Sequence, residues 1–288
     1  MPVFDTPQPI SVTLELAIGS ARIIAGATDR TSVEVLPSRE SKPADIKAAE
    51  HTRVEYSGGQ LRVISPKNWK HYTPFGGSGS VDVTIELPAG SAVHGESAVG
   101  EFHAEGRLGE CTLTSGVGDI SLEETGPLTV KTGTGDITAD RIAGHAEIIT
   151  GSGSVRIRTI DGSAELKNSN GHTAIGDVTG EIRLRGANGD ISVDRAHSSI
   201  VAKTAHGKVR IGEIMRGSAL LESSFGKLDL GIRNGTAAWL DVTTQHGKVR
   251  NSLTADSGPT EADETAEVRA RTSWGDITIR RSTESANS

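Results

Sequence analysis

The sequence predicts an all-β protein, a single parallel β-solenoid with about 18 residues and two strands per coil. Three observations lead to this prediction. A glycine-led motif recurs at a nearly constant step, a second row of glycines lies halfway between its copies, and apolar residues alternate between these turns. A repeat at a fixed period is typical of solenoids, in which each coil is stable only against its neighbours.

The main glycine precedes a polar residue and then usually a β-branched or aliphatic one. Successive intervals are 18, 17, 18, 18, 18, 18, 19, 21 and 28 residues, and these glycines are Gly100, Gly118, Gly135, Gly153, Gly171, Gly189, Gly207, Gly226, Gly247 and Gly275. The polar run 257–264 lengthens the last interval, and we expect it to be a loop that projects from one coil.

The second glycine row indicates two turns, and so two strands, in each coil. Its members each precede a main glycine by nine residues, and they are Gly126, Gly144, Gly162, Gly180 and Gly217. A lone coil buries six or seven small apolar side chains, worth roughly 1.5–3 kcal/mol each. Ordering its residues costs about 1.5 kcal/mol per residue, so stacking at about 4.8 Å is required.

Alternation identifies the expected core. After the main glycine, the inward pairs are Ile120/Leu122, Ile137/Ala139, Val155/Ile157, Thr173/Ile175, Ile191/Val193, Val209/Ile211, Leu228/Leu230 and Ile277/Ile279. On the return strand they are Cys111/Leu113, Leu128/Val130, Ala146/Ile148, Ala164/Leu166, Ile182/Leu184, Ile200/Ala202 and Ala219/Leu221. A third apolar row closes the corner, with Ile142, Ile160, Val178, Ala196 and Ile214. Each row keeps the step of the repeat, as strands on one interior must.

A polar row of the same parity follows the return strand: Ser115, Thr132, Thr150, Asn168, Gly186, Thr204 and Ser223. We expect these side chains to sit at the corner and to bond along the stack. Cys111 falls in an inward row, where a cysteine is a small hydrophobe rather than a nucleophile.

The first ninety residues follow the repeat less regularly. We expect residues 1–90 to be irregular opening coils and a cap of the same solenoid, with a long loop at 66–80. A short helix is predicted at 42–50, with the acidic Asp45 in its first turn. Residues 91–282 are expected to form the regular solenoid and residues 283–288 a disordered tail.

Composition excludes several classes of protein. The net charge of −7 argues against a general nucleic-acid binder. Cys111 is the only cysteine, so neither an intramolecular disulfide nor a cysteine metal cluster is expected. The sequence begins without a signal-peptide pattern and has no run of eighteen apolar residues, so we expect a cytoplasmic protein without membrane insertion. No cofactor is expected.

The motif Gly-Asp-Ile recurs at 118–120, 135–137, 189–191 and 275–277. With this repeat the chain resembles the bacterial "putative adhesin" family of β-strand-repeat proteins, a domain of unknown function, over residues 10–281. The resemblance implies a parallel β-solenoid and supplies no catalytic residues.

The aspartates of this motif are expected at one corner of the stack. Asp119 and Asp136 would lie about one strand spacing apart, near 4.8 Å. Two carboxylates so close could bind calcium through their oxygens. The favoured alternative is that each aspartate accepts hydrogen bonds from the turn's backbone, as Asp commonly does. No metal site is predicted.

The same corner is expected to become basic further along, with three lysines in three successive coils. Like charges stacked at strand spacing repel, so the row indicates either an anionic partner or a solvated edge that prevents aggregation. As a candidate site for an anionic ligand, we take this basic corner row: His206, Lys208, Arg210, Lys227, His246, Lys248 and Arg250.

Two functional hypotheses follow. The first is a non-enzymatic structural or interaction protein that presents a rigid repetitive surface, docking a protein partner or self-associating end to end. The alternative is a carbohydrate-binding or carbohydrate-active solenoid that uses the basic corner row, for example on an acidic polymer. No cluster of convergent acidic and basic residues is evident, and the aromatic residues Trp69, Tyr72, Trp239 and Trp274 are scattered, so we expect no enzyme.

Overall fold

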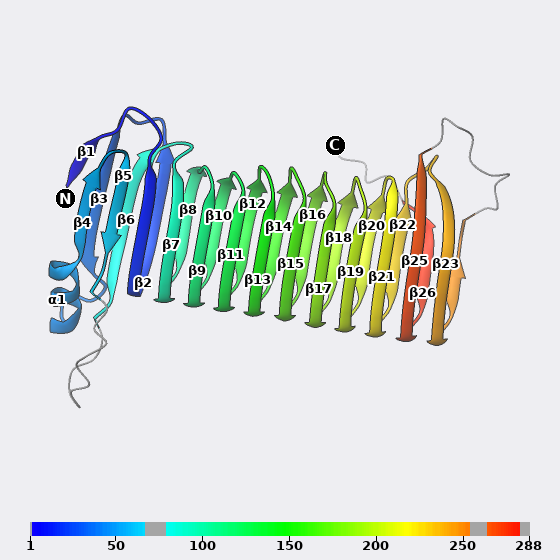
Figure 1. Cartoon of the computed structure of the whole chain (residues 1–288). Coiled ribbons are helices and arrows are strands. Elements are labelled where there is room, and N and C mark those ends of the chain that lie inside the picture. Colours follow the sequence, from blue (N-terminus) through cyan, green and yellow to red (C-terminus); the bar gives the residue numbers. More distant parts are fainter. Residues whose placement is uncertain (1, 67–78, 254–263, 283–288) are drawn as a thin grey trace. The chain divides into compact units, whose positions relative to one another are not determined.

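The computed structural model describes residues 2–66, 79–253 and 264–282 (Figure 1). The chain divides into two compact units, residues 1–143 (unit 1) and 144–288 (unit 2). In each unit, short strands pair in parallel from coil to coil, which confirms the predicted all-β solenoid. The predicted tail at 283–288, and most of the predicted loops at 66–80 and 257–264, lie outside the described residues.

Unit 1 contains the helix α1, Pro43–His51, and strands β1 to β12. The strands are β1 Val3–Asp5, β2 Ser11–Gly26, β3 Arg30–Pro37, β4 Arg53–Ser57, β5 Gln60–Ile64, β6 Val81–Pro88, β7 Ala92–Val99, β8 Phe102–Arg107, β9 Cys111–Val117, β10 Ile120–Thr125, β11 Leu128–Thr134 and β12 Ile137–Ile142.

Strand β2 is long enough to contribute to both sheets. Its first half pairs in parallel with β5 and β7 in sheet B, and its second half pairs with β6 and β8 in sheet A. Gly19, with a φ of 150°, lies between the two halves. The coil made by β2 therefore lies between coil β5/β6 and coil β7/β8, out of chain order.

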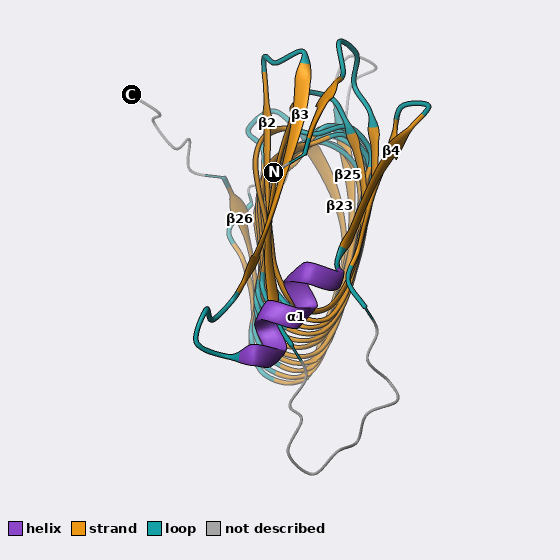
Figure 2. Cartoon of the chain, turned by 90° about the vertical axis from the view of Figure 1, so that its left-hand side faces the viewer, coloured by secondary structure: helices purple, strands orange, loops and turns teal. Residues whose placement is uncertain are grey.

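The outer side of coil β5/β6 is covered by strands that run antiparallel. β3 pairs with β6, β4 with β5, and β1 with β3, in place of further parallel coils. β4 and β5 form a hairpin through Gly58 and Gly59, whose positive φ values suit a tight turn. α1 confirms the predicted helix and lies across this end of unit 1 between β3 and β4 (Figure 2).

The helix is held by one buried carboxylate. Asp45 forms an ion pair with Lys42 at 2.9 Å and accepts a 2.9 Å hydrogen bond from the backbone N–H of Ser80. The hydrogen bond from Lys42 is the main cause that lowers the pKa of Asp45 below its ordinary value. These bonds connect the first turn of α1 to the start of β6.

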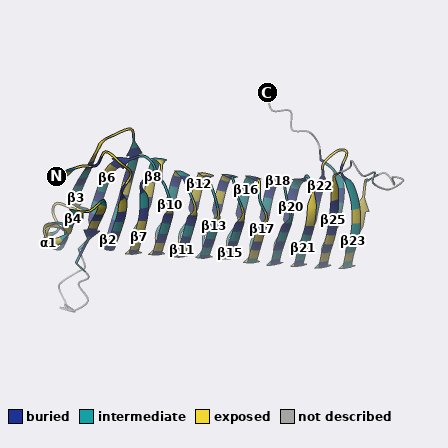
Figure 3. Cartoon of the chain, turned by 45° about the horizontal axis from the view of Figure 1, so that its top comes forward, coloured by how far each residue is buried: buried dark blue, intermediate teal, exposed yellow. Residues whose placement is uncertain are grey.

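Unit 2 contains strands β13 to β26. They are β13 Ala146–Ser152, β14 Val155–Ile160, β15 Ala164–Asn170, β16 Thr173–Val178, β17 Ile182–Asn188, β18 Ile191–Ala196, β19 Ile200–His206, β20 Val209–Ile214, β21 Gly217–Phe225, β22 Leu228–Ile232, β23 Ala237–His246, β24 Val249–Asn251, β25 Thr265–Trp274 and β26 Ile277–Arg281. Buried and exposed residues alternate along these strands (Figure 3).

The predicted core is confirmed. Every residue of the predicted inward pairs and of the third apolar row is buried. The register also follows the repeat, since Ile191 pairs with Val209 and Ile200 with Ala219. Each coil thus covers the small apolar interior of its neighbour.

The last two coils of unit 2 are not in chain order. In sheet B, β25 pairs with both β21 and β23, and in sheet A, β26 pairs with both β22 and β24 (Figure 1). The C-terminal coil β25/β26 is therefore inserted between coil β21/β22 and coil β23/β24. We call β23/β24 the terminal coil of unit 2.

Candidate functional site

The inserted coil changes the predicted basic corner row. Leu228 N donates to Asp276 O and Ile277 N donates to Lys248 O, so the spatial order at this corner is Lys208, Lys227, Asp276, Lys248. The expectation of three lysines in three successive coils is wrong, because it assumed that coils stack in chain order. Only Lys208 and Lys227 are neighbours.

The two arginines of the row are also separated. Arg210 pairs in register with Asp229, and Arg250 pairs with Thr278. Asp229 itself forms an ion pair with Arg280 at 3.2 Å. Along the outward face after the corner, an acidic and a neutral residue therefore lie between the two arginines, and the seven predicted residues do not form one continuous basic surface.

The two histidines belong instead to an exposed aromatic row. The rings of His206 and Phe225 are stacked with centroids 5.1 Å apart, and those of His246 and Trp274 with centroids 3.9 Å apart. Phe225 is 50% exposed and Trp274 is 52% exposed. Trp274 is thus not a scattered residue. Sequence reasoning missed this row although a signal was available, since each of its four residues directly precedes a main glycine of the repeat. Only the order of the four rings along the stack required the true coil order.

The aspartates at the corner accept hydrogen bonds from backbone N–H groups, as favoured above, but these groups belong to the next coil and not to the aspartate's own turn. Asp119 accepts a 2.8 Å hydrogen bond from the N–H of Asp136 in the next coil. Asp190 does the same with the N–H of Lys208 at 2.8 Å. In the described part of the chain, no group of three or more His, Cys, Asp or Glu side chains is placed to hold a metal ion.

The predicted polar row bonds along the stack, but through carbonyls rather than neighbouring side chains. Asn168 Nδ2 donates to the carbonyl of Gly153 at 3.0 Å, and Ser223 Oγ donates to that of Gly207 at 3.1 Å. Each acceptor is the corner glycine of the adjacent coil. The row therefore satisfies carbonyls that the turn leaves free. Cys111 is buried in the core, and burial raises the pKa of its thiol to about 12.

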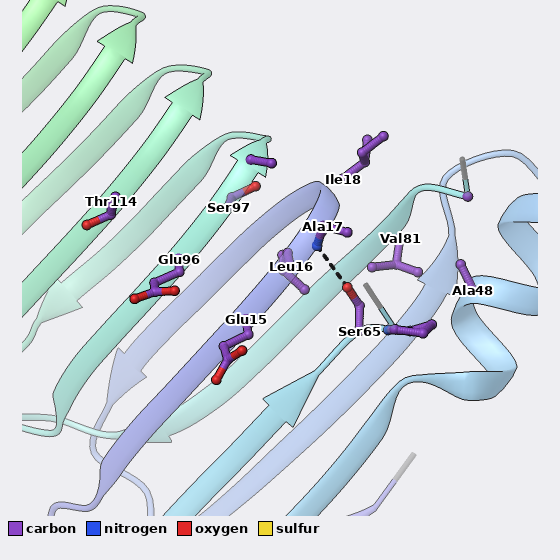
Figure 4. A pocket seen from close by; sticks show the side chains of 13 residues that line it. Glu15, Leu16, Ala17, Ile18, Ala48, Ser65, Val81, Glu96, Ser97 and Thr114 are labelled. Carbon is purple, nitrogen blue, oxygen red and sulfur yellow. Dashed lines mark hydrogen bonds between the residues drawn. The ribbon is translucent and has the colours of Figure 1, made fainter. Parts of the chain in front are cut away.

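A cavity of about 390 Å³ lies in unit 1 near α1 (Figure 4). Apolar residues such as Leu16 and Val81 line it, and Ser97 Oγ has no hydrogen-bond partner among the described residues. Pro66 and Gly79, which border the undescribed stretch 67–78, also line it. The volume is therefore that left by the described residues alone.

A second hollow, which we call the trough, lies on the outer face of sheet B in unit 2. Its volume is about 640 Å³, and it crosses β17, β19, β21, β25 and β23. One side carries charged residues in register, in the order Arg185, Lys203, Glu222, Arg271, with Thr243 last. Its remaining lining consists of small or polar residues: Gly186, Thr204, Ala205, Ser223, Ser224, Gln245, Thr272 and Ser273.

The terminal coil has an incompletely covered interior. Val268 and Ala270 of β25 are 0% exposed, whereas their register partners Leu240 and Val242 on β23 are only half-buried. Val249 on β24 is 46% exposed. Within residues 144–253 and 264–282, β23 pairs only with β25, and β24 only with β26. The outer edge of both strands is therefore free of described neighbours.

No helix among the described residues is long and apolar enough to cross a membrane. A search of curated proteins found no match. Similar solved structures are a putative adhesin from Bacteroides fragilis (14% identity, 96% of this chain and 95% of that chain, TM-score 0.40) and a putative adhesin from Parabacteroides merdae (11% identity, 80% and 94%, TM-score 0.47). A third is a putative cell adhesion protein from Clostridium sporogenes (10% identity, 97% and 98%, TM-score 0.25).

The family model described as Toastrack DUF4097 matches residues 13–280, which is most of the chain. The stacked coils in both units agree with the β-solenoid of this domain. The chain belongs to the Toastrack DUF4097 family, a family of unknown function.

Proposed function

We propose that this protein is a non-enzymatic, adhesin-like interaction protein that binds a second copy of itself end to end through the terminal coil of unit 2. The observation that supports this most is the uncovered interior of coil β23/β24. In a solenoid each coil is stabilised by the next one, so a coil with one free side lacks half of its stacking partners.

The edge of β23 has few features that prevent strand pairing. It is ten residues long and contains no proline. Its inward-facing residues Leu240, Val242 and Thr244 are uncharged. Natural edge strands are usually protected by proline, bulges or inward charges. β23 therefore offers backbone N–H and C=O groups that no described strand pairs with, beside an apolar surface.

A second copy related by a two-fold axis fits this edge better than a second copy added head to tail. Two terminal coils related by a two-fold axis across the solenoid run antiparallel, and such an interface is self-complementary and closes at a dimer. In unit 1 the outermost coil is already paired with β3 and β4 and packed beside α1. Among the described residues of unit 1, that end offers no free parallel coil to match β23/β24.

Sedimentation equilibrium over a range of protein concentrations tests the proposal. The wild-type chain is expected to form a dimer reversibly. Val242→Lys places a charge on the inward side of the edge and is expected to weaken dimerisation at least tenfold, because a buried unpaired charge is strongly unfavourable. Gln245→Lys adds the same charge on the exposed side of the same strand and is the matched control.

Wild-type chain that stays monomeric at high concentration would overturn the proposal. So would a dimer that Val242→Lys and Gln245→Lys weaken equally, because the association would then depend on net charge rather than on the coil interior. A circular dichroism spectrum of each variant verifies that the solenoid remains folded.

The carbohydrate alternative through the basic corner row keeps one supporting feature, the neighbouring exposed residues Lys208 and Lys227. Asp276 beyond Lys227 and Asp229 beyond Arg210 place carboxylates within that row. These carboxylates weaken the support for an anionic ligand at this corner, so self-association remains the main proposal. Titration of acidic glycans against Lys208→Glu tests the alternative.

A further inference from the structure

We propose that the trough on sheet B of unit 2 binds an acidic glycan that carries one carboxylate on every second sugar. This inference concerns a different surface from the terminal-coil interior and does not depend on self-association. It uses residues outside the predicted basic corner row. Three features of the trough support it: its length, its order of charges and the aromatic row beside it.

The length suits an extended chain that runs across the strands. The trough crosses five neighbouring strands, which at about 4.8 Å per strand is a span of about 19 Å. Ser224 and Ser273 provide hydroxyl groups in its small polar lining. A chain lying in the trough therefore meets a similar surface at each strand.

The charges in the trough are mainly basic and accessible. Arg185 forms no ion pair with any residue that the structure describes, and Lys203 is its neighbour in register. Lys203 pairs with Glu222 at 2.8 Å and Arg271 pairs with Asp241 at 3.0 Å, but all four side chains are at least a third exposed. Such exposed pairs stabilise little, so a ligand carboxylate can share or replace them.

The order of these charges selects the ligand. Lys203 and Arg271 are two strands apart, about 9.6 Å, and Glu222 lies between them. With one sugar per strand, a carboxylate on every sugar would place one against Glu222. A carboxylate on alternate sugars meets Lys203 and Arg271 and leaves a neutral sugar at Glu222. Arg185, the register neighbour of Lys203, shares the carboxylate that Lys203 binds. A peptide fits less well, because side chains on one face of an extended strand repeat at about 6.8 Å.

The aromatic row lies directly after the trough residues in sequence. Ala205 precedes His206, Ser224 precedes Phe225, and Ser273 precedes Trp274. The exposed halves of Phe225 and Trp274 offer apolar surface to the C–H groups of a sugar beside the trough. The basic side of the trough and the aromatic row thus contact different faces of one chain.

Isothermal titration of the full chain tests the inference with four probes. They are a hyaluronan octasaccharide, with alternating carboxylates; an octagalacturonate, with one on each sugar; neutral maltooctaose; and an octaglutamate peptide. We expect the hyaluronan octasaccharide to bind at least about fivefold more tightly than any other probe. Glu222→Gln is expected to reduce the preference of the protein for the hyaluronan octasaccharide over octagalacturonate, because the carboxylate that repels octagalacturonate is removed.

A matched pair of variants locates the site. Arg185→Glu reverses a charge in the trough, and Arg183→Glu reverses one on the same strand outside it. We expect Arg185→Glu and Arg271→Glu each to weaken binding about tenfold or more, and Arg183→Glu to change it less than about twofold. Val242→Lys, the variant designed to weaken dimerisation, is titrated with the same probes. If it binds the hyaluronan octasaccharide like the wild-type chain, glycan binding does not depend on dimerisation.

Several outcomes would overturn the inference. These are absence of binding by the hyaluronan octasaccharide, equally tight binding of octaglutamate, or equal losses from Arg183→Glu and Arg185→Glu. The last would show attraction to overall charge rather than a site. Melting temperatures of the variants verify that each remains folded.

Discussion

Both units place one coil out of chain order, but they treat the resulting outermost coil differently. In unit 1, coil β5/β6 is displaced to the outside of β2 and is then covered by β3, β4 and α1. In unit 2, coil β23/β24 is displaced to the outside of β25/β26, with no described element on its outer side.

The effect of the cover is visible in the interior residues. Leu61 and Val63 of β5 are 0% exposed. Leu240 and Val242, in the outermost coil of unit 2, are only half-buried. The same kind of coil is therefore complete in one unit and incomplete in the other. An outer coil needs either a cap or a partner, and unit 2 carries no described cap.

The largest expected effect is a difference in the free energy of unfolding between alanine substitutions at two leucines in sheet B of unit 2. Leu221→Ala, in a coil covered on both sides, should destabilise the chain by about 2–5 kcal/mol through a cavity in the core. Leu240→Ala, in the terminal coil, should destabilise the monomer by less than about 1.5 kcal/mol, because less surface is buried. Urea unfolding of both variants at low concentration measures the difference, and equal losses would contradict the comparison.

A second test concerns the closeness of stacked coils. At Gly189, φ is 135° and an added Cβ would lie 2.1 Å from the carbonyl oxygen of Gly171. Gly189→Ala should therefore destabilise unit 2 by about 1–3 kcal/mol or more. At Gly26, where an added Cβ meets nothing within 4 Å, Gly26→Ala should be nearly neutral. Similar unfolding midpoints for the two variants would rule out tight stacking at this corner.

A third test concerns the cap of unit 1 and its pH dependence. Because the folded-state pKa of Asp45 is lowered, its contribution to stability is present above its ordinary pKa of about 3.9 and is lost as the pH falls through the lower folded value. Asp45→Asn should therefore lower stability at pH 7 and flatten the acid dependence. Thermal melts of both proteins between pH 2 and pH 7 measure this, and parallel curves would speak against the ion pair with Lys42.

The smallest effect is expected at Cys111. Since burial raises the pKa of its thiol to about 12, the native chain should react very slowly with a thiol reagent at pH 8, and rapidly once unfolded in urea. Fast labelling of the folded chain would show that the interior of unit 1 opens readily.

Local patterns in the sequence predicted most of the fold. The 18-residue step placed residues such as Ile191 and Val209 in one buried row, because parallel stacking repeats the same environment in every coil. The coil order could not be predicted in this way. Every coil carries similar stacking residues, so a given coil could occupy several positions in the stack. The 28-residue interval before Gly275 was the available signal, because so long a connection can pass over a whole coil.

The candidate site depended on that order and was therefore predicted less well. Lys208 and Lys227 are neighbours as expected, but Asp276 separates them from Lys248. Trp274 lies between Phe225 and His246 in the aromatic row for the same reason. The trough combines residues from five strands with different spacings, which a single repeat period does not reveal.

Hydrogen exchange at increasing protein concentration tests the central claim most directly, since it reads the backbone of the terminal coil itself. The amides of β25 and β26, paired on both sides, should exchange slowly at every concentration. Those of β23 and β24 should exchange quickly in dilute solution and become protected as copies associate. Equal and concentration-independent protection of β23 and β25 would contradict the account.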